Sequence, residues 1–211
     1  MMHPALSFLC AALFLGAASL ASAQDKPKPR GNIGVNGPKV GTAAPDFTLL
    51  TVEGKSVQAS SLWKDKPAVI MTASHTCPVF RGKVTGFQAV AKEYAEQVNF
   101  LVVYTIEAHP KGDPSPYSGK EWVTPKNEQD GILFRQPTEQ SERTKRAREC
   151  VEREKMTVPV VVDTLENTVW KAYGCAPNCA YVIGTDGKIA DAQPWMELNH
   201  LRQTLARLTA K

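Results

Sequence analysis

The cysteine at position 77 is the side chain in this sequence best placed for nucleophilic or redox chemistry. It lies in the segment Ser74-His75-Thr76-Cys77-Pro78, between an apolar run typical of a buried strand and a stretch with helical spacing. Backbone N–H groups at the start of a helix have no partners within the helix, and the helix dipole adds positive potential there. Both effects favour a thiolate, so Cys77 is predicted to be a redox-active nucleophile. The alternative is a buried, inert cysteine that only closes the strand.

The surrounding pattern predicts the strands and helices that must position this cysteine. The apolar run 68–72 precedes it, and apolar residues recur at every third or fourth position from Phe80 to Val98, which is typical of an amphipathic helix. Further strands are expected at 100–104, 158–162 and 180–183, further helices near 139–155, 165–173 and 198–208, and an N-terminal hairpin across 47–57. This alternation predicts an α/β fold with a mixed central sheet and helices on both faces.

A long inserted loop is expected between the second strand and the next helix. Residues 107–137 contain five prolines and no clear period, so they are either a functional loop or a disordered one. Tyr117, Trp122 and Phe134 are candidates to line a substrate pocket under this loop. The alternative is that these aromatic side chains only pin the loop to the surface.

Composition narrows the class of protein. The chain has 211 residues, with 25 Lys+Arg, 21 Asp+Glu and 43% hydrophobic residues, which is ordinary globular composition and excludes a disordered chain or a coiled coil. A net charge of +4 gives little reason to expect a nucleic-acid partner. Five cysteines are too few for a small domain built on disulfides.

The N-terminal segment predicts export. An apolar stretch ends in Ala21-Ser22-Ala23 and is followed by polar residues, as in a secretory signal peptide cleaved after Ala23, although no Lys or Arg precedes it. We therefore expect a signal peptide at 1–23, a flexible lead-in at 24–40 and one domain at 41–211. The mature protein would be secreted or periplasmic, with no membrane attachment.

Four motifs, in the same order along the chain, resemble the iodothyronine deiodinase family and its bacterial relatives. They are Ser74-His75-Thr76-Cys77-Pro78-Val79-Phe80, Glu107-Ala108-His109, the run 159–164 and the run 172–183. Residues 41–49 also look like the opening of thioredoxin-fold redoxins. The resemblance covers roughly residues 41–209 and implies a thioredoxin-like fold, with Cys77 where the family has selenocysteine. The family's second hormone-binding histidine has no counterpart, since only His200 follows His109, so the substrate is not implied.

The resemblance also implies the residues that support Cys77. His109 would donate a proton to the leaving group or orient the substrate, and Glu107 would orient His109. The alternative for His109 is a loop histidine that hydrogen-bonds the backbone. Ser74 and Thr76 would support the thiol. His75 stands where the family has a cysteine; its position beside Cys77 could stabilise the thiolate, although its side chain could equally point away.

The loop before residues 180–183 faces the nucleophile in a thioredoxin fold and often carries a cis-proline, for which Pro177 is the candidate. Cys175 or Cys179 on this loop could attack an oxidised Cys77 and resolve it as a disulfide. The alternatives are a local Cys175–Cys179 disulfide with a structural role, or two free thiols. Cys150 is expected to pack in the core, with its charged neighbours forming a solvated face. Those neighbours are Arg143, Lys145, Arg146, Glu149, Glu152 and Arg153.

Taken together, these residues predict a secreted thiol-dependent oxidoreductase that reduces a peroxide, a disulfide or a halogenated aromatic. It would need no cofactor, only an external thiol reductant, and its partners would be a small molecule or a protein thiol. One alternative is a copper or zinc site made by His75, Cys77 and His109 with Cys175 and Cys179. Another is a redox-inactive module that binds a partner through the proline-rich loop.

Overall fold

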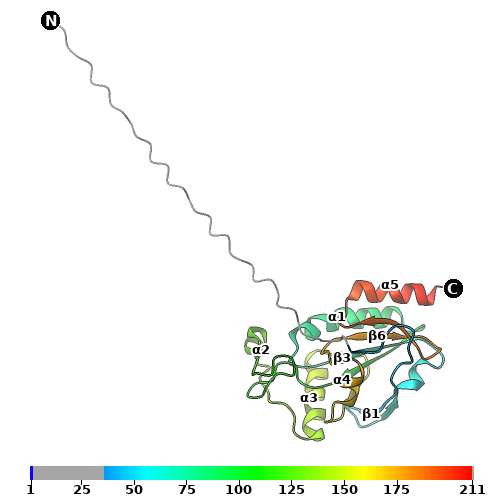
Figure 1. Cartoon of the computed structure of the whole chain (residues 1–211), viewed down its shortest axis with the longest axis horizontal. Helices are drawn as coiled ribbons and strands as arrows, with labels where there is room; N and C mark the ends of the chain where they lie inside the picture. Colours follow the sequence, from blue (N-terminus) through cyan, green and yellow to red (C-terminus); the bar gives the residue numbers. More distant parts are fainter. Residues whose placement is uncertain (2–35, 211) are drawn as a thin grey trace.

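Seven strands form one mixed sheet in the order β2-β1-β5-β4-β3-β6-β7, which runs through the centre of the molecule (Figure 1). The structure is a computed structural model that describes Met1 and residues 36–210. The strands are β1 (Thr48–Thr51), β2 (Ser56–Gln58), β3 (Ala68–Ala73), β4 (Asn99–Tyr104), β5 (Val160–Val162), β6 (Ala180–Ile183) and β7 (Ile189–Gln193). β3, β4 and β5 run parallel, whereas the remaining pairs are antiparallel. The three parallel strands read as unbroken apolar runs because side chains on both faces are covered.

Helices cover both faces of this sheet. They are α1 (Pro78–Glu93), α2 (Pro125–Asp130), α3 (Gln140–Arg153), α4 (Thr168–Ala172) and α5 (Leu198–Thr209), with a 3-10 helix, η1, at Ala59–Trp63. Apolar side chains of α1, α3 and α5 share one core with alternate strand residues, and those of η1 and α4 share a second core with the others. Helix α5 lies alongside α1 (Figure 1). The predicted α/β class, with a mixed sheet covered on both faces, is confirmed.

The N-terminal hairpin is also confirmed. β1 and β2 pair antiparallel from Thr48 opposite Gln58 to Leu50 opposite Ser56. Gly54 makes the turn with a φ of 87°, a left-handed conformation in which a Cβ would be strained.

The start of the described chain joins the opposite edge of the sheet. The N–H of Gly41 donates to the carbonyl of Ile189, the N–H of Ile189 donates to the carbonyl of Thr42, and Gly37 packs against the Tyr181 hydroxyl. Within the described end of the expected lead-in, Gly37 therefore contacts the domain, whereas Val40 is 61% exposed. The rest of that segment and the predicted signal peptide lie outside the described residues, apart from Met1. Within the part of the chain that is described, no helix is long and apolar enough to cross a membrane.

The long loop at 107–137 is ordered and contains a helix that the sequence pattern does not predict. Thr124 caps α2 by accepting from the N–H of Asn127, Pro125 opens it, and Gly131 ends it with a φ of 67°. A helix of six residues has too few turns to show an apolar period, so only its caps identify it. The loop closes on itself through the ion pair between Arg135 and Asp113, at 2.7 Å.

The charged face expected on α3 is only partly solvated. Cys150 packs in the core as predicted. Arg143 is buried, and its guanidinium donates to the carbonyl of Thr164. Arg148 likewise reaches the carbonyl of Val52 at 2.7 Å. Both side chains supply donors to carbonyls at the end or edge of a strand, a role that charge patterning along a helix cannot reveal.

Candidate active site

Cys77 is the N-cap residue of α1, directly after β3. Its φ of −86° and ψ of 105° continue the extended strand, and Pro78 occupies the first helical turn. The backbone N–H of Phe80 donates to the Cys77 sulfur at 3.4 Å. The sequence therefore places the thiol at the helix start, as expected from the strand–proline–helix pattern.

The protonation of Cys77 differs from the expectation. Burial raises the pKa of the thiol, and this effect outweighs the backbone N–H groups of Phe80 and Val79, the charge of Arg81 and the nearby amide of Asn178, all of which lower it. The side chain is only 1% exposed. Local helix geometry favours a thiolate, but loss of water favours the neutral thiol more strongly. The resting site therefore holds a thiol.

Asn178 is a site residue that the sequence pattern does not identify. It is fully buried, and neither its side-chain nitrogen nor its oxygen has a hydrogen-bond partner of normal geometry among the described residues. Unpaired buried amide atoms cost about 1–3 kcal/mol. This amide lies beside the Cys77 sulfur and lowers its pKa, so it can donate a hydrogen bond once the sulfur carries charge.

These surroundings predict how Cys77 reacts with an alkylating reagent. Alkylation should be slow at neutral pH and should still be rising at pH 9, because the thiol pKa lies above its usual 9.0. Asn178→Leu should slow alkylation by a further threefold to tenfold, which corresponds to the free energy of about one hydrogen bond. Site-resolved mass spectrometry of iodoacetamide adducts measures both effects. Cys175 in the same sample is the reference, since burial and Lys171 alone shift its pKa. A rate for Cys77 that levels off below pH 8 would contradict the burial argument.

A buried carboxylate holds the backbone around Cys77. Glu107 Oε2 accepts from the N–H of Thr76 at 2.9 Å, from the Thr76 hydroxyl at 2.7 Å and from the Ser74 hydroxyl at 3.1 Å. Its other oxygen accepts from the hydroxyl of Tyr104. Glu107 is fully buried, and this donor set compensates the loss of water from its charge. Glu107 therefore positions the segment before Cys77 rather than the imidazole of His109.

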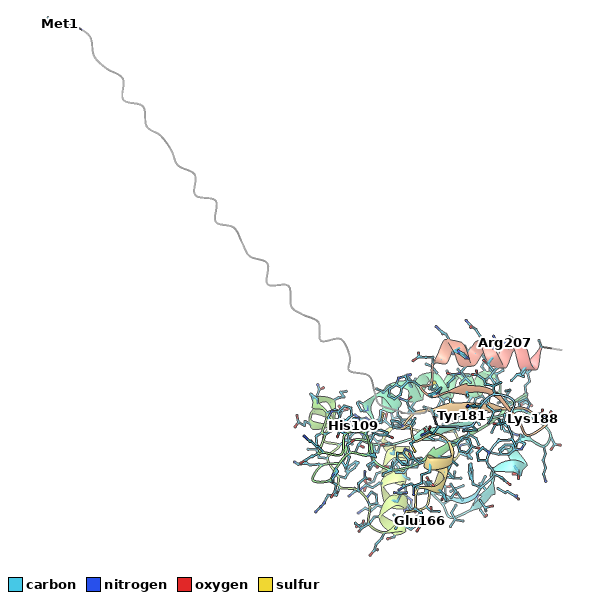
Figure 2. The ribbon with its side chains drawn as sticks, in the orientation of Figure 1. Met1, His109, Glu166, Tyr181, Lys188 and Arg207 are labelled. Atoms are coloured by element: carbon cyan, nitrogen blue, oxygen red, sulfur yellow. The ribbon has the colours of Figure 1, made fainter. Side chains whose placement is uncertain are left out.

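His109 is tied to the same segment through its backbone. Its N–H donates to the Thr76 hydroxyl at 2.9 Å. Its ring packs edge-on against Trp122, with centroids 4.3 Å apart, and its Nδ1 lies 3.2 Å from the Trp122 carbonyl. A carbonyl only accepts, so Nδ1 is assigned the proton and Nε2 the lone pair. Burial lowers the pKa of His109 to about 4, which keeps the ring neutral at pH 7. Figure 2 shows His109 at the opposite end of the domain from Lys188, which lies in the turn between β6 and β7.

Cys77 and His109 line one cavity of about 240 Å³. Its walls are Pro78, Val79, Tyr117, Trp122, Thr124, Pro177 and Trp195. Two of the three aromatic residues predicted for the loop, Tyr117 and Trp122, are therefore at the thiol. Trp195 follows β7 and comes from a part of the chain for which the sequence carried no signal.

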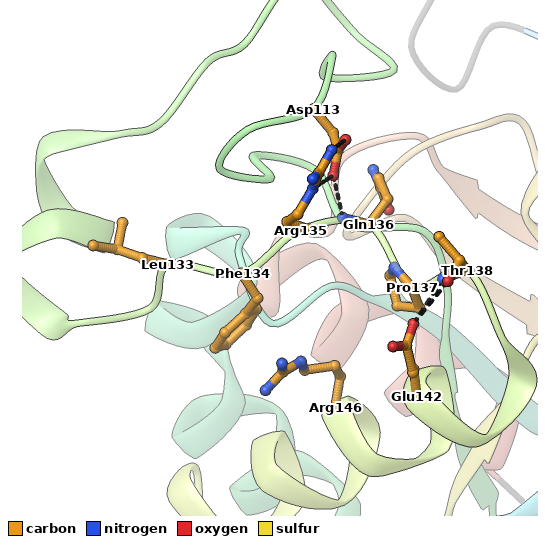
Figure 3. A pocket seen from close by; sticks show the side chains of 9 residues that line it. All are labelled: Asp113, Leu133, Phe134, Arg135, Gln136, Pro137, Thr138, Glu142 and Arg146. Atoms are coloured by element: carbon orange, nitrogen blue, oxygen red, sulfur yellow. Dashed lines mark hydrogen bonds and ion pairs between the residues drawn. The ribbon is translucent and has the colours of Figure 1, made fainter.

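Phe134 and His75 do not lie in this cavity. The ring of Phe134 packs on that of His75, with centroids 5.1 Å apart, and under the guanidinium of Arg146 at 4.5 Å. Phe134 and Arg146 line a separate, open pocket of about 650 Å³, where they face each other (Figure 3). Burial lowers the pKa of His75 to about 3, so its ring is neutral. Phe134 therefore lines a pocket at the long loop, as Tyr117 and Trp122 do, but this pocket is separate from the cavity at Cys77.

The remaining cysteines are free thiols in the described chain. Cys179 is buried on the other face of the sheet from Cys77, and its sulfur lies 3.1 Å from the Thr72 hydroxyl. Cys175 is partly exposed and has a left-handed φ of 58°. Pro177 lines the cavity, but the described chain has no cis peptide bond. The expected cis-proline is therefore absent, in keeping with the usual preference for trans.

The alternative metal site is not assembled. Among the residues that the structure describes, no group of three or more His, Cys, Asp or Glu side chains could hold a metal ion. Cys179 lies across the sheet from Cys77, and His75 packs on Phe134. Of the five residues in the copper or zinc hypothesis, only Cys77 and His109 line the same cavity.

The comparisons with known proteins agree with this geometry. The family model for iodothyronine deiodinase matches residues 35–208. The chain belongs to the iodothyronine deiodinase family. A type II iodothyronine deiodinase from Fundulus heteroclitus is 26% identical over 155 residues, covering 66% of this chain and 54% of the relative. A thyroxine 5-deiodinase from Gallus gallus is 27% identical over 174 residues, covering 75% and 62%. The chain thus spans little more than half the length of these curated relatives.

Solved structures place this deiodinase-family chain in the thioredoxin fold. The thioredoxin domain of a thiol-disulfide oxidoreductase from Bacteroides vulgatus superposes with a TM-score of 0.58 at 14% identity, covering 82% of this chain and 99% of that one. A peroxidoxin from Mycobacterium tuberculosis gives 0.54 at 19% identity, covering 81% and 96%. Identities this low establish the fold alone. The predicted thioredoxin-like architecture and deiodinase resemblance are both confirmed.

Proposed function

We propose that this deiodinase-family protein is a thiol-dependent oxidoreductase in which Cys77 is the nucleophile and a halogenated aromatic is the substrate. The observation that carries the proposal is the position of the Cys77 sulfur, at a helix start in an aromatic cavity that it shares with the neutral imidazole of His109. The family supports the reaction class, since its relatives carry the name deiodinase. Reduction of a peroxide or a disulfide by the same thiol is the alternative chemistry.

The resting protonation states set the order of proton transfers. Cys77 holds its proton because burial raises the pKa of the thiol, and Nε2 of His109 carries the free lone pair. His109 would take the proton of Cys77 when substrate arrives and then donate it to the ring carbon that loses halogen. The backbone N–H of Phe80 and the amide of Asn178 stabilise the thiolate formed in between.

The electrons come from an external thiol. The Cys77 thiolate attacks the halogen, the carbon–halogen bond breaks, a sulfur–halogen bond forms, and the ring carbon takes the proton. One external thiol then displaces halide and forms a mixed disulfide with Cys77. A second external thiol releases an external disulfide and restores the Cys77 thiol. The substrate gains two electrons in this cycle, and two external thiols lose one each.

Trapping experiments test the nucleophile. Wild-type protein treated with oxidant and then with glutathione should carry a sulfenic acid or a mixed disulfide on Cys77, detected by mass spectrometry. Cys77→Ser should lose both the adduct and all thiol-dependent turnover. Cys150→Ala is the matched control, because Cys150 lies in the core and its pKa is raised by burial. Turnover that survives Cys77→Ser would sink the proposal and favour a partner-binding role.

We also propose that the protein is exported, on the basis of the apolar segment that ends in Ala21-Ser22-Ala23. The full chain expressed in a Gram-negative host should appear in the periplasm with Gln24 as its first residue, as read by N-terminal sequencing. Recovery of protein that still begins at Met1 from the cytoplasm would contradict export.

A further inference from the structure

The cavity at Cys77 has no charged side chain among the described residues of its wall. Among the described residues that line it, six are apolar, aromatic or proline side chains, and the others are Cys77, His109 and Thr124. Burial lowers the pKa of His109 to about 4, so this ring adds no charge at neutral pH. A carboxylate or an ammonium group placed in the cavity would therefore lose water without gaining an opposite charge.

The polar atoms of the wall are largely used within the protein. The Tyr117 hydroxyl accepts from Trp170 Nε1 at 3.1 Å, and Thr124 Oγ1 accepts from the N–H of Asn127 at 3.2 Å. His109 Nδ1 faces the Trp122 carbonyl. Among the described wall residues, His109 Nε2 keeps its lone pair, each of the two hydroxyl oxygens keeps a second lone pair, and the hydroxyl hydrogens of Tyr117 and Thr124 remain as donors. All of these groups are neutral, so they can hydrogen-bond a hydroxyl group but supply no opposite charge to an amino-acid head group.

The cations near the cavity already have partners in the protein. The ammonium of Lys83 lies 5.8 Å from the centroid of the Trp195 ring, and it donates to the carbonyl of Met196 and, at 3.1 Å, to Glu197. Arg81 donates to the carbonyl of His75, to Asn127 and to Asp130, at 2.6, 3.0 and 2.9 Å. Lys126 pairs with the same Asp130 at 2.6 Å. Arg81 and Lys126 line a different surface pocket, with Pro78, Gly82, Arg153 and Glu154. A carboxylate bound at Cys77 would therefore have to displace a protein partner before it could pair with Lys83, Arg81 or Lys126.

The size of the cavity limits the substrate further. Its volume of about 240 Å³ lies below the roughly 300–1,000 Å³ of pockets that hold drug-sized ligands. Tyr117, Trp122 and Trp195 offer aromatic surfaces on which a planar ring can pack edge-on or offset. One substituted ring fits within the cavity, whereas a second ring with a charged tail would extend beyond it.

We propose that the site takes an uncharged, single-ring phenol as substrate. Its ring lies among these aromatic side chains, and its hydroxyl accepts from the hydroxyl of Tyr117 or Thr124, which leaves His109 Nε2 free to take the proton of Cys77. This inference rests on the proposed function and specifies its substrate class: a halogenated phenol without an amino-acid group. Trp195 packs on the ring and determines specificity, because it closes the cavity from the segment between β7 and α5.

A matched pair of ligands tests this class. 2-Iodo-4-methylphenol and 3-iodotyrosine share the iodinated phenol ring, and only the second carries an ammonium and a carboxylate. Calorimetry on Cys77→Ser, at about pH 6.5 so that the phenol is neutral, measures binding without turnover. The phenol should bind at least about tenfold more tightly, which is about 1.4 kcal/mol. Trp195→Ala should weaken its binding about tenfold, whereas Leu133→Ala, in the separate pocket, should not.

The outcomes separate this inference from the proposed function. If 3-iodotyrosine binds as tightly as the phenol, or if neither ligand binds, the uncharged single-ring class is wrong, while adduct formation on Cys77 is unaffected. If the phenol binds as expected but wild-type protein forms no Cys77 adduct, the nucleophile proposal fails and the binding class stands. If Trp195→Ala binds the phenol as tightly as the protein with Trp195 intact, the role proposed for Trp195 in specificity is wrong.

Discussion

Glu107→Ala is expected to lower the free energy of unfolding by about 3–5 kcal/mol, as when one partner of a buried charged network is removed. The substitution leaves the N–H and hydroxyl of Thr76 and the hydroxyls of Ser74 and Tyr104 without their common acceptor. All of these groups are buried, so water cannot replace the carboxylate without opening the structure. Urea unfolding followed by circular dichroism measures the loss.

Glu107→Gln separates the acceptor from the charge. An amide oxygen in place of Oε2 still accepts from Thr76, and the Tyr104 hydroxyl can turn to accept from the amide nitrogen. We therefore expect a loss of about 1–2 kcal/mol for this variant, smaller than that for alanine. A loss below 1 kcal/mol for Glu107→Ala would show that the network does not hold the segment before Cys77.

Acid is expected to destabilise the protein at a pH where most carboxylates are still charged. Burial lowers the pKa of His75 to about 3 from an ordinary 6.5. Below pH 6.5 this histidine therefore binds a proton in the unfolded chain but not in the folded chain. The free energy of unfolding consequently falls as the pH falls, until about pH 3. At pH 5 this one side chain accounts for about 2 kcal/mol of lost stability. His109, with its pKa lowered to about 4, acts in the same direction.

His75→Phe should remove about half of the acid sensitivity that the two histidines cause between pH 8 and pH 5. A phenyl ring keeps the packing on Phe134, and both ring nitrogens of His75 lack hydrogen-bond partners within the described chain. Urea midpoints between pH 8 and pH 5 should therefore fall less in the variant than in the wild type, and the pH 8 values should be similar. His200→Gln is the control, because His200 lies at the surface beside Asp191. Parallel pH profiles for wild type and His75→Phe would refute the argument.

The periodicity of apolar residues predicted the strands and helices that position Cys77. It did not predict the short helix and the site residues in the segments between them. The alternation of strands and helices, the hairpin and the burial of Cys150 all follow from repeating apolar positions. Helix α2 is too short to show a repeating apolar pattern. The burial of Arg143 depends on its hydrogen bond to the carbonyl of Thr164, which is distant in sequence. Trp195 and Asn178 reach the site from segments without a period. The balance that sets the protonation of Cys77 also escaped prediction, because burial depends on chain segments distant in sequence.

The carboxylate of Glu107 holds the segment before the nucleophile through oxygen and nitrogen donors alone. None of these contacts is a bond that a thiol can reduce, and the cysteines of the described chain are all free. The proposed cycle consumes thiols, so a scaffold clamped by a disulfide would loosen as the reductant rises. Here the concentration of the thiol reductant can be raised to increase turnover without breaking the contacts that hold the site. The structure of the site is therefore independent of the reducing conditions that the cycle requires.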